Sequence, residues 1–125
     1  MENNMASAVS EKGLEYRIAE ILDSKKAGDI TIVSVGHLTV IAEKFVICSA
    51  TSNLQVRSLR DEVEEQLKKQ GVELIRNDGD RDSRWVVLDY GHVIVHIFHS
   101  QEREFYNIER LWADGSNIER YSAAQ

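Results

Sequence analysis

One stretch of the chain, residues 84–99, constrains the fold more than any other. Two runs rich in β-branched and aromatic residues flank the tetrapeptide Asp89-Tyr90-Gly91-His92, which predicts a β-hairpin with Tyr90 and Gly91 at its tip. Because strand side chains alternate between two faces, the hairpin can be sorted by parity. One face is purely aliphatic, and we expect it to pack under helices. Its members are Val86, Leu88, Val93, Val95 and Ile97.

The opposite face of the hairpin is apolar but mixed. With a two-residue tip at Tyr90-Gly91, Trp85 would lie opposite His96. A face that combines tryptophan and histidine with aliphatic side chains is expected where a sheet meets a partner rather than its own core. The alternative is that the C-terminal turn and Trp112 cover Trp85 and Phe98 and make them core, because large aromatic side chains are more often packed than displayed. Its members are Trp85, Val87, Ile94, His96 and Phe98.

The rest of the chain predicts helices and strands around this hairpin. Residues 45–50 are apolar without alternation, which indicates a central strand covered on both faces. Ser52 and Gln55 form a capping box at the start of a helix that ends at Gly71. Its inward stripe is Val56, Leu59, Val63 and Leu67. Further elements are expected as a helix from Ser10 to Lys25, strands at 30–35 and 72–76, and helical turns at 101–105 and 108–112.

This order predicts an α+β or α/β fold, in which a mixed β-sheet contains a strand-helix-strand crossover and carries flanking helices. We expect one domain over residues 11–113, with a flexible N-terminal arm over 1–10 and a weakly structured, flexible tail over 114–125.

Composition limits the classes of function. The chain has 15 basic and 21 acidic residues and a net charge of −6, which suits a basic protein partner better than nucleic acid. No apolar run is long enough to cross a membrane, and the first ten residues lack a signal-peptide pattern. The single cysteine, Cys48, is expected to be inert in a buried strand. These features predict a cytoplasmic protein.

The sequence offers several weak candidates for chemistry, and none of them predicts a cofactor, a metal or catalysis. The acidic loop 78–83 lacks the glycine and the closing glutamate of a calcium site. Of the nearby histidines, His99 is expected on the opposite face from His92 and His96, so zinc is disfavoured. The turn at Ser49–Ser52 precedes a helix but lacks the glycines and lysine of a phosphate loop.

Two groups of residues resemble the Iojap family, the ribosomal silencing factors of bacteria and organelles. The first group comprises Phe45-Val46-Ile47-Cys48-Ser49, Thr51-Ser52-Asn53 and Gln55-Val56. The second comprises Trp85 to Gly91, Val95 to Phe98, Arg103, Phe105-Tyr106 and Glu109 to Trp112. The resemblance runs from about Leu14 to Ala113. The chain departs from the family pattern at Glu43-Lys44, Leu54, Asp78-Gly79 and His92, which lie in expected turns and helix starts and therefore affect local contacts.

The resemblance implies a translation factor that is not an enzyme and whose fold is similar to that of nucleotidyltransferases, without their acidic metal-binding pair. Such a factor binds a large-subunit ribosomal protein at the face that meets the small subunit, and blocks subunit joining when nutrients are scarce. The partner-binding residues expected on this basis are Trp85, Val87, Asp89, Ile94, His96, Phe98, Arg103, Tyr106, Leu111 and Trp112.

Two other functions stay open from the sequence. One is a nucleotidyltransferase-like enzyme that uses the Ser49–Ser52 turn, although the central strand supplies no carboxylate pair to hold metal ions. The other is a homodimeric module that buries the mixed hairpin face against a second copy of itself.

Overall fold

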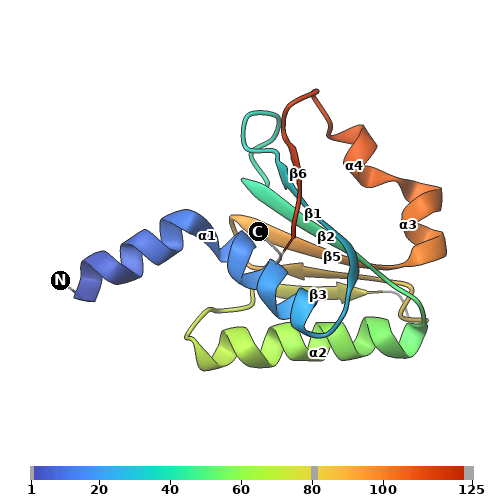
Figure 1. Ribbon diagram of the computed structural model, residues 1–125, viewed down its shortest axis with the longest axis horizontal. Coiled ribbons are helices and arrows are strands. Elements are labelled where there is room, and N and C mark those ends of the chain that lie inside the picture. The colour runs from blue at the N-terminus through green and yellow to red at the C-terminus, as the bar shows by residue number, and fades with distance from the viewer. Residues whose placement is uncertain (1, 80–81, 123–125) are drawn as a thin grey trace.

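A computed structural model describes residues 2–79 and 82–122, with side chains from Gly13 onward (Figure 1). Within that part, six strands form one mixed sheet in the order β3-β4-β5-β2-β1-β6. The strands are β1 (Gly28–Ser34), β2 (Lys44–Ala50), β3 (Arg76–Gly79), β4 (Trp85–Asp89), β5 (Val93–His99) and β6 (Ile118–Arg120). The helices are α1 (Glu2–Ser24), α2 (Asn53–Lys69), α3 (Ser100–Tyr106) and α4 (Ile108–Leu111).

The predicted mixed sheet is confirmed. β2 and β5 are parallel neighbours, whereas the other strand pairs are antiparallel. β2 is central and buried along its length from Phe45 to Ala50, as its unbroken apolar pattern predicts. Half of the predicted capping box is present, since the cap Ser52 Oγ accepts from Gln55 N at 3.0 Å; Gln55 Oε1 accepts from Thr51 N, one residue before the cap, at 2.7 Å.

The hairpin is present, but its tip differs from the prediction by one residue. Tyr90 N donates to Val93 O at 2.9 Å, so Gly91 and His92 form the tip. Gly91 has φ +96°, which a primed hairpin turn needs at its first tip position and glycine adopts without strain. Trp85 therefore lies opposite Phe98 rather than His96, and Val87 lies opposite His96. The cross-strand partner of each residue therefore shifts by two positions, and because side chains alternate with a period of two, each residue keeps the predicted face of the sheet.

The aliphatic hairpin face packs under α1 and α2, as predicted (Figure 1). Val86, Leu88, Val93, Val95 and Ile97 all belong to the main core. The predicted stripe of α2, at Val56, Leu59, Val63 and Leu67, meets them there. α1 bends at Gly13, whose φ of +107° lies outside the helical range, and its C-terminal half contributes Ile18 and Leu22 to the same core.

Two strands lie where the sequence analysis did not place them. Residues 72–75 form an extended connector whose Val72 and Leu74 touch the core, and β3 begins only at Arg76. β3 is an exposed polar edge strand, paired through its backbone to β4, so its side chains carry no strand signal. β6 lies in the expected tail and pairs with β1, where Tyr16 on α1 donates to Glu119 at 2.5 Å.

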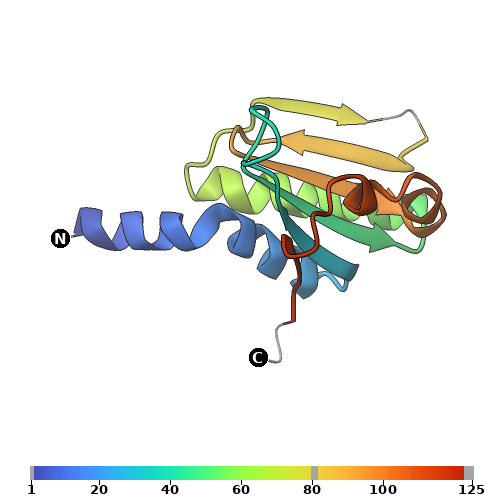
Figure 2. The same ribbon diagram turned by 90° about the horizontal axis from the view of Figure 1, so that it is seen from above.

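The other face of the sheet carries a second, smaller core beneath α3 and α4 (Figure 2). Val33, Phe45, Ile47, Phe98 and Ile108 are buried in it. Trp85, Ile94 and Trp112 pack at its edge and stay partly exposed. The mixed hairpin face is therefore partly covered by the C-terminal helices.

Candidate functional site

A row of aromatic rings crosses the sheet face beneath α3 and α4. Its centroid distances are 4.9 Å from Tyr106 to Trp85, 6.1 Å from Trp85 to His96, 4.9 Å from His96 to Phe45, and 5.4 Å from Phe45 to Trp112. The rings come from β4, β5, β2, α3 and the end of α4, so the row ties the two short helices to three strands. Such tilted and edge-to-face pairs add to the stabilisation from buried area.

Several predicted contact residues lie inside this second core. Phe98 has no exposed surface and stacks on Trp85 with ring centroids 4.7 Å apart. His96 is 9% exposed and Arg103 is 7% exposed. In this conformation, direct contact with a partner through Phe98 is excluded, and His96 and Arg103 offer little surface. The alternative, in which the C-terminal turn and Trp112 cover Trp85 and Phe98, therefore holds for Phe98, whereas Trp85 stays partly exposed.

His96 is held neutral by its surroundings. Its Nδ1 atom accepts a hydrogen bond from Trp85 Nε1 at 3.2 Å, so Nε2 carries the proton of the neutral ring. That Nε2 atom is buried without a hydrogen-bond partner among the described residues. Burial lowers the pKa of His96 from 6.5 to about 4. At neutral pH this histidine therefore behaves as a packed aromatic ring.

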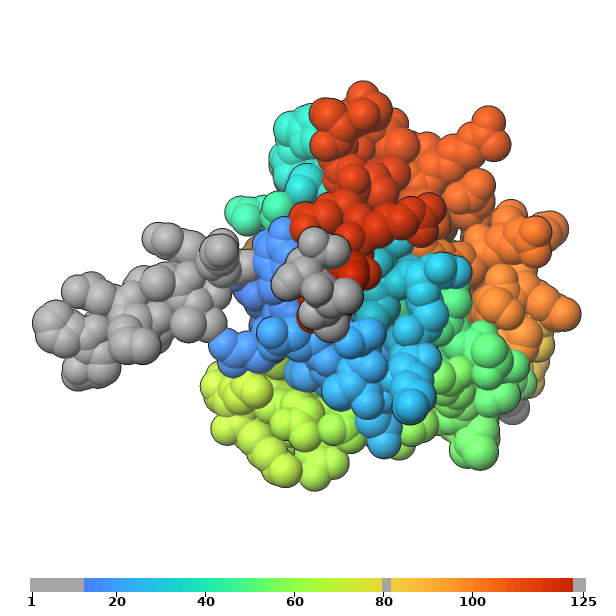
Figure 3. Space-filling view, in the orientation of Figure 1, coloured from blue at the N-terminus to red at the C-terminus, as the bar shows by residue number. Residues whose placement is uncertain are grey.

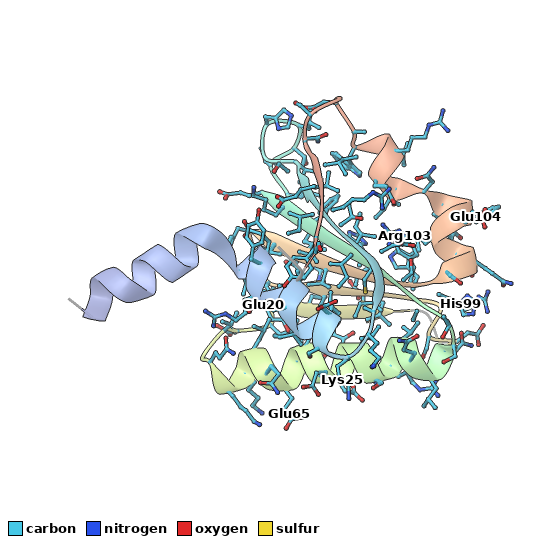
Figure 4. The ribbon with its side chains drawn as sticks, viewed as in Figure 1. Glu20, Lys25, Glu65, His99, Arg103 and Glu104 are labelled. Atoms are coloured by element: carbon cyan, nitrogen blue, oxygen red, sulfur yellow. The ribbon has the colours of Figure 1, made fainter. Side chains whose placement is uncertain are left out.

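Arg103 is a structural anchor between α3 and the sheet. It points inward from α3, whereas its neighbour Glu104 points away from the sheet (Figure 4). Its guanidinium donates to Ser49 Oγ at 3.0 Å, to Thr31 Oγ1 at 2.9 Å and to the carbonyl of Asp29. Nε and Nη2 both reach Glu109 Oε2, at 3.2 and 2.9 Å. All five N–H donors are therefore used within the fold, and none is left to bind an anion.

The exposed part of the predicted site lies at the edges of the two helices. Tyr106 is 46% exposed and Leu111 is 77% exposed. Asp89 is half-buried, and its Oδ1 accepts from Gly91 N at 2.8 Å, which is a turn-forming contact. We call the accessible set the C-terminal face; its members are Trp85, Val87, Ile94, Tyr106, Leu111 and Trp112.

Sequence reasoning missed one prominent member of this region. Phe105 is 79% exposed, and its ring lies 4.9 Å from that of Tyr106 in an edge-to-face arrangement. The sequence placed Phe105 in a helical turn but gave no means of deciding which side of the turn faces solvent. Only the structure places Arg103 inward, and Phe105 then points outward because side chains two residues apart lie on opposite sides of a helix.

Two of the weaker candidates for chemistry, Cys48 and His99, have structural roles, whereas residues 80–81 of the acidic loop 78–83 lie outside the described residues. Cys48 is fully buried in β2, as predicted, and burial raises the pKa of its thiol to about 12, which disfavours the nucleophilic thiolate. His99 Nδ1 caps α3 by accepting from Gln101 N at 3.2 Å. Across residues 13–79 and 82–122, whose side chains the structure describes, no three His, Cys, Asp or Glu side chains gather as metal ligands would. Helices in the same ranges include none with the length and hydropathy of a membrane span.

Comparison with known sequences points to one family. The family model described as "Ribosomal silencing factor during starvation" matches residues 8–125. The protein named Ribosomal silencing factor RsfS from Halalkalibacterium halodurans is 38% identical over 98 residues, covering 78% of this chain and 84% of the relative. The protein of the same name from Bacillus subtilis is 34% identical over 106 residues, covering 85% and 90%. The chloroplastic protein Iojap of Zea mays is 33% identical, covering 82% of this chain and 44% of the maize protein.

Solved structures agree with the sequence comparison. A crystal structure of a protein from Chromobacterium violaceum has a TM-score of 0.74 and 31% identity, covering 80% of this chain and 85% of that one. A second structure, from Bacillus halodurans, has a TM-score of 0.68 and 35% identity, covering 76% and 89%. With a family model that matches nearly the whole chain and relatives that share both sequence and fold, this chain belongs to the ribosomal silencing factor family.

Proposed function

We propose that this protein represses translation by binding the large ribosomal subunit and blocking its association with the small subunit. The observation that carries the proposal is the family match over residues 8–125. We further propose that the partner is a basic ribosomal protein at the subunit interface, that the factor is not an enzyme, and that its fold is related to that of nucleotidyltransferases. The acidic net charge of −6 supports a basic partner.

The C-terminal face is the surface we propose for this contact. It combines two tryptophans and a tyrosine with aliphatic side chains, and aromatic side chains are enriched among residues that dominate binding energy. The aromatic row and Arg103 hold α3 and α4 on the sheet, so the face is ordered before a partner arrives. A preordered surface loses little conformational entropy on binding. Away from the ribosome, we expect the same face to pair with a second copy of the chain.

Leu111 offers the sharpest test because it is exposed and contributes little to the fold. Purified protein is sedimented with isolated large and small subunits, and the same protein is added to a subunit-joining assay. We expect binding to large subunits only and inhibition of joining. Leu111→Asp should weaken binding at least tenfold, because it places a charge in an apolar contact.

The matched control is Leu54→Asp at the start of α2, where leucine is also well exposed, at 68%. This variant should bind within twofold of the parent. Protein that sediments free of large subunits, or equally with both subunits, would overturn the proposed function. Equal binding by Leu111→Asp and Leu54→Asp would remove the C-terminal face from the contact.

A further inference from the structure

A second apolar surface lies on the loop between β1 and β2. Leu38 is 46% exposed, Ile41 is 59% exposed, and the side chain of Val40 is fully accessible. The loop is nevertheless ordered by its own backbone. Val35 N and Gly36 N donate to Glu43 O at 2.9 and 3.2 Å, and Glu43 N donates to His92 O at 2.8 Å. An ordered loop that displays successive aliphatic side chains is uncommon on a surface that serves only solubility.

The hairpin tip joins this loop to a further exposed aliphatic residue. Val40 and Ile41 line a shallow pocket together with Gly91 and His92 of the tip. On the other side of the tip, Ile75 is 63% exposed, and its Cδ1 lies 3.4 Å from where a Cβ on Gly91 would be. In Figure 1 the 36–43 loop lies above β5, and the segment that leads into β3 lies below it. We call Val40, Ile41 and Ile75 the hairpin-tip patch.

The charges around the patch are mainly acidic. Glu43 lines the pocket and is exposed. Glu73 is exposed two residues before Ile75 in the extended connector, where alternate residues share a side. The nearby cation Arg76 lies 3.9 Å from the carboxylate of Asp78. An apolar centre with a carboxylate rim suits a basic protein segment and disfavours nucleic acid, whose phosphates it would repel.

The patch is also linked to the C-terminal face. His37 of the same loop pairs with Asp114 at 2.6 Å, just after Trp112. The loop and the C-terminal segment lie side by side in the space-filling view (Figure 3). Ile94, a member of the C-terminal face, follows the hairpin tip on β5. One partner can therefore reach both surfaces.

We propose that the hairpin-tip patch is a second docking surface, which takes a basic protein segment bearing an apolar side chain. This inference rests on the proposed function, since it assigns that segment to the large ribosomal subunit. The patch extends the contact beyond the C-terminal face and adds specificity for a partner that is both apolar and cationic.

Photocrosslinking from the patch identifies what lies on it. Val40→Cys is labelled with a benzophenone maleimide, mixed with purified large subunits and irradiated. Cys48 does not compete for the label because it is fully buried and its thiol pKa is raised to about 12. We expect a cross-link to a large-subunit protein at a site rich in lysine or arginine. Leu54→Cys, labelled in the same way, should give none.

Affinity for large subunits supplies the second measurement. Ile41→Asp should weaken binding about tenfold or more, whereas Leu54→Asp should change it less than twofold. If the parent protein binds large subunits but position 40 cross-links only to RNA or to nothing, the hairpin-tip patch is not a docking surface. The proposed function is unaffected by that result. The same holds if Ile41→Asp binds like the parent while Leu111→Asp does not. Failure of the parent to bind overturns both.

Discussion

Arg103 offers the most informative perturbation, because its role is structural and yet it lies beneath the proposed contact. Arg103→Met keeps the aliphatic stem and removes five N–H donors. Ser49 Oγ, Thr31 Oγ1 and the carbonyl of Asp29 then lose a donor, and the carboxylate of Glu109 loses its partner. Only 8% of the Arg103 side chain and 19% of the Glu109 side chain are exposed. Breaking a buried pair from one side typically costs about 3–5 kcal/mol.

Because Glu109 keeps some contact with water, we expect the lower end of this range, a loss of about 3 kcal/mol in the free energy of unfolding. For a domain of this size, that loss corresponds to a fall of about 10 °C in melting temperature. Arg103→Lys should recover only part of the loss, since an ammonium group cannot replace a planar fork with five donors. Arg110→Met is the matched control on neighbouring α4, where the arginine is exposed. It should stay within about 0.5 kcal/mol of the parent.

The assay combines thermal unfolding with hydrogen exchange of the native protein. If Arg103 anchors α3 and α4, their amides should exchange faster in Arg103→Met while β2 and β5 stay protected. The double variant with Glu109→Leu should be more stable than the sum of the two single changes predicts, because it removes the unpaired carboxylate. A melting temperature within 2 °C of the parent, or uniform loss of protection across the sheet, would refute the anchoring role; the 2 °C limit corresponds to about 0.5 kcal/mol.

Two further outcomes follow from the aromatic row. Trp85→Ala should lose about 2–4 kcal/mol of stability as well as binding, because Trp85 stacks on Phe98 and contacts Tyr106 at a tilted angle. Leu88→Ala, in the main core, should lose similar stability, and a Trp85 variant that melts like the parent would contradict the packing. His96 has a pKa lowered to about 4 by burial, so its contribution to stability is complete above pH 6.5 and declines as the pH falls from 6.5 toward 4. The parent should therefore lose about 2 kcal/mol more than His96→Phe between pH 7 and pH 5 in denaturant titrations, and equal losses would refute a buried neutral histidine.

Most of the sheet and helix α2 could be predicted from the sequence, but the edge strands β3 and β6 could not. β2 was predictable because an unbroken apolar run is rare outside a strand covered on both faces. β3 was not, because the polar residues from Arg76 to Gly79 form a strand only through backbone pairing with β4. The apolar residues Val72 and Leu74 pointed to a strand earlier in the chain, and they instead anchor the connector to the core.

The sequence indicated which residues share the candidate face, but it did not indicate which of their side chains are exposed. Parity needs only the alternation of side chains along a strand, so it sorted the hairpin faces although the tip was misplaced by one residue. Exposure depends on what covers a face. Here α3 and α4 cover it, and they contact β2 through Arg103 and Trp112 and β4 through Tyr106. Nothing in the local pattern of residues 100–112 states where those helices lie.

The loop that carries the hairpin-tip patch shows the converse case, in which apolar residues expected to be buried are exposed. Leu38, Val40 and Ile41 look like ordinary core residues in the sequence, and backbone hydrogen bonds hold the loop that carries them. Val35 and Ala42, on either side of them, belong to the second core, whereas the loop residues between them project away from it. Apolar residues that the fold leaves exposed on an ordered loop lower solubility and do not add stability. A partner that covers them removes that cost, and this physical reason favours the patch as a contact.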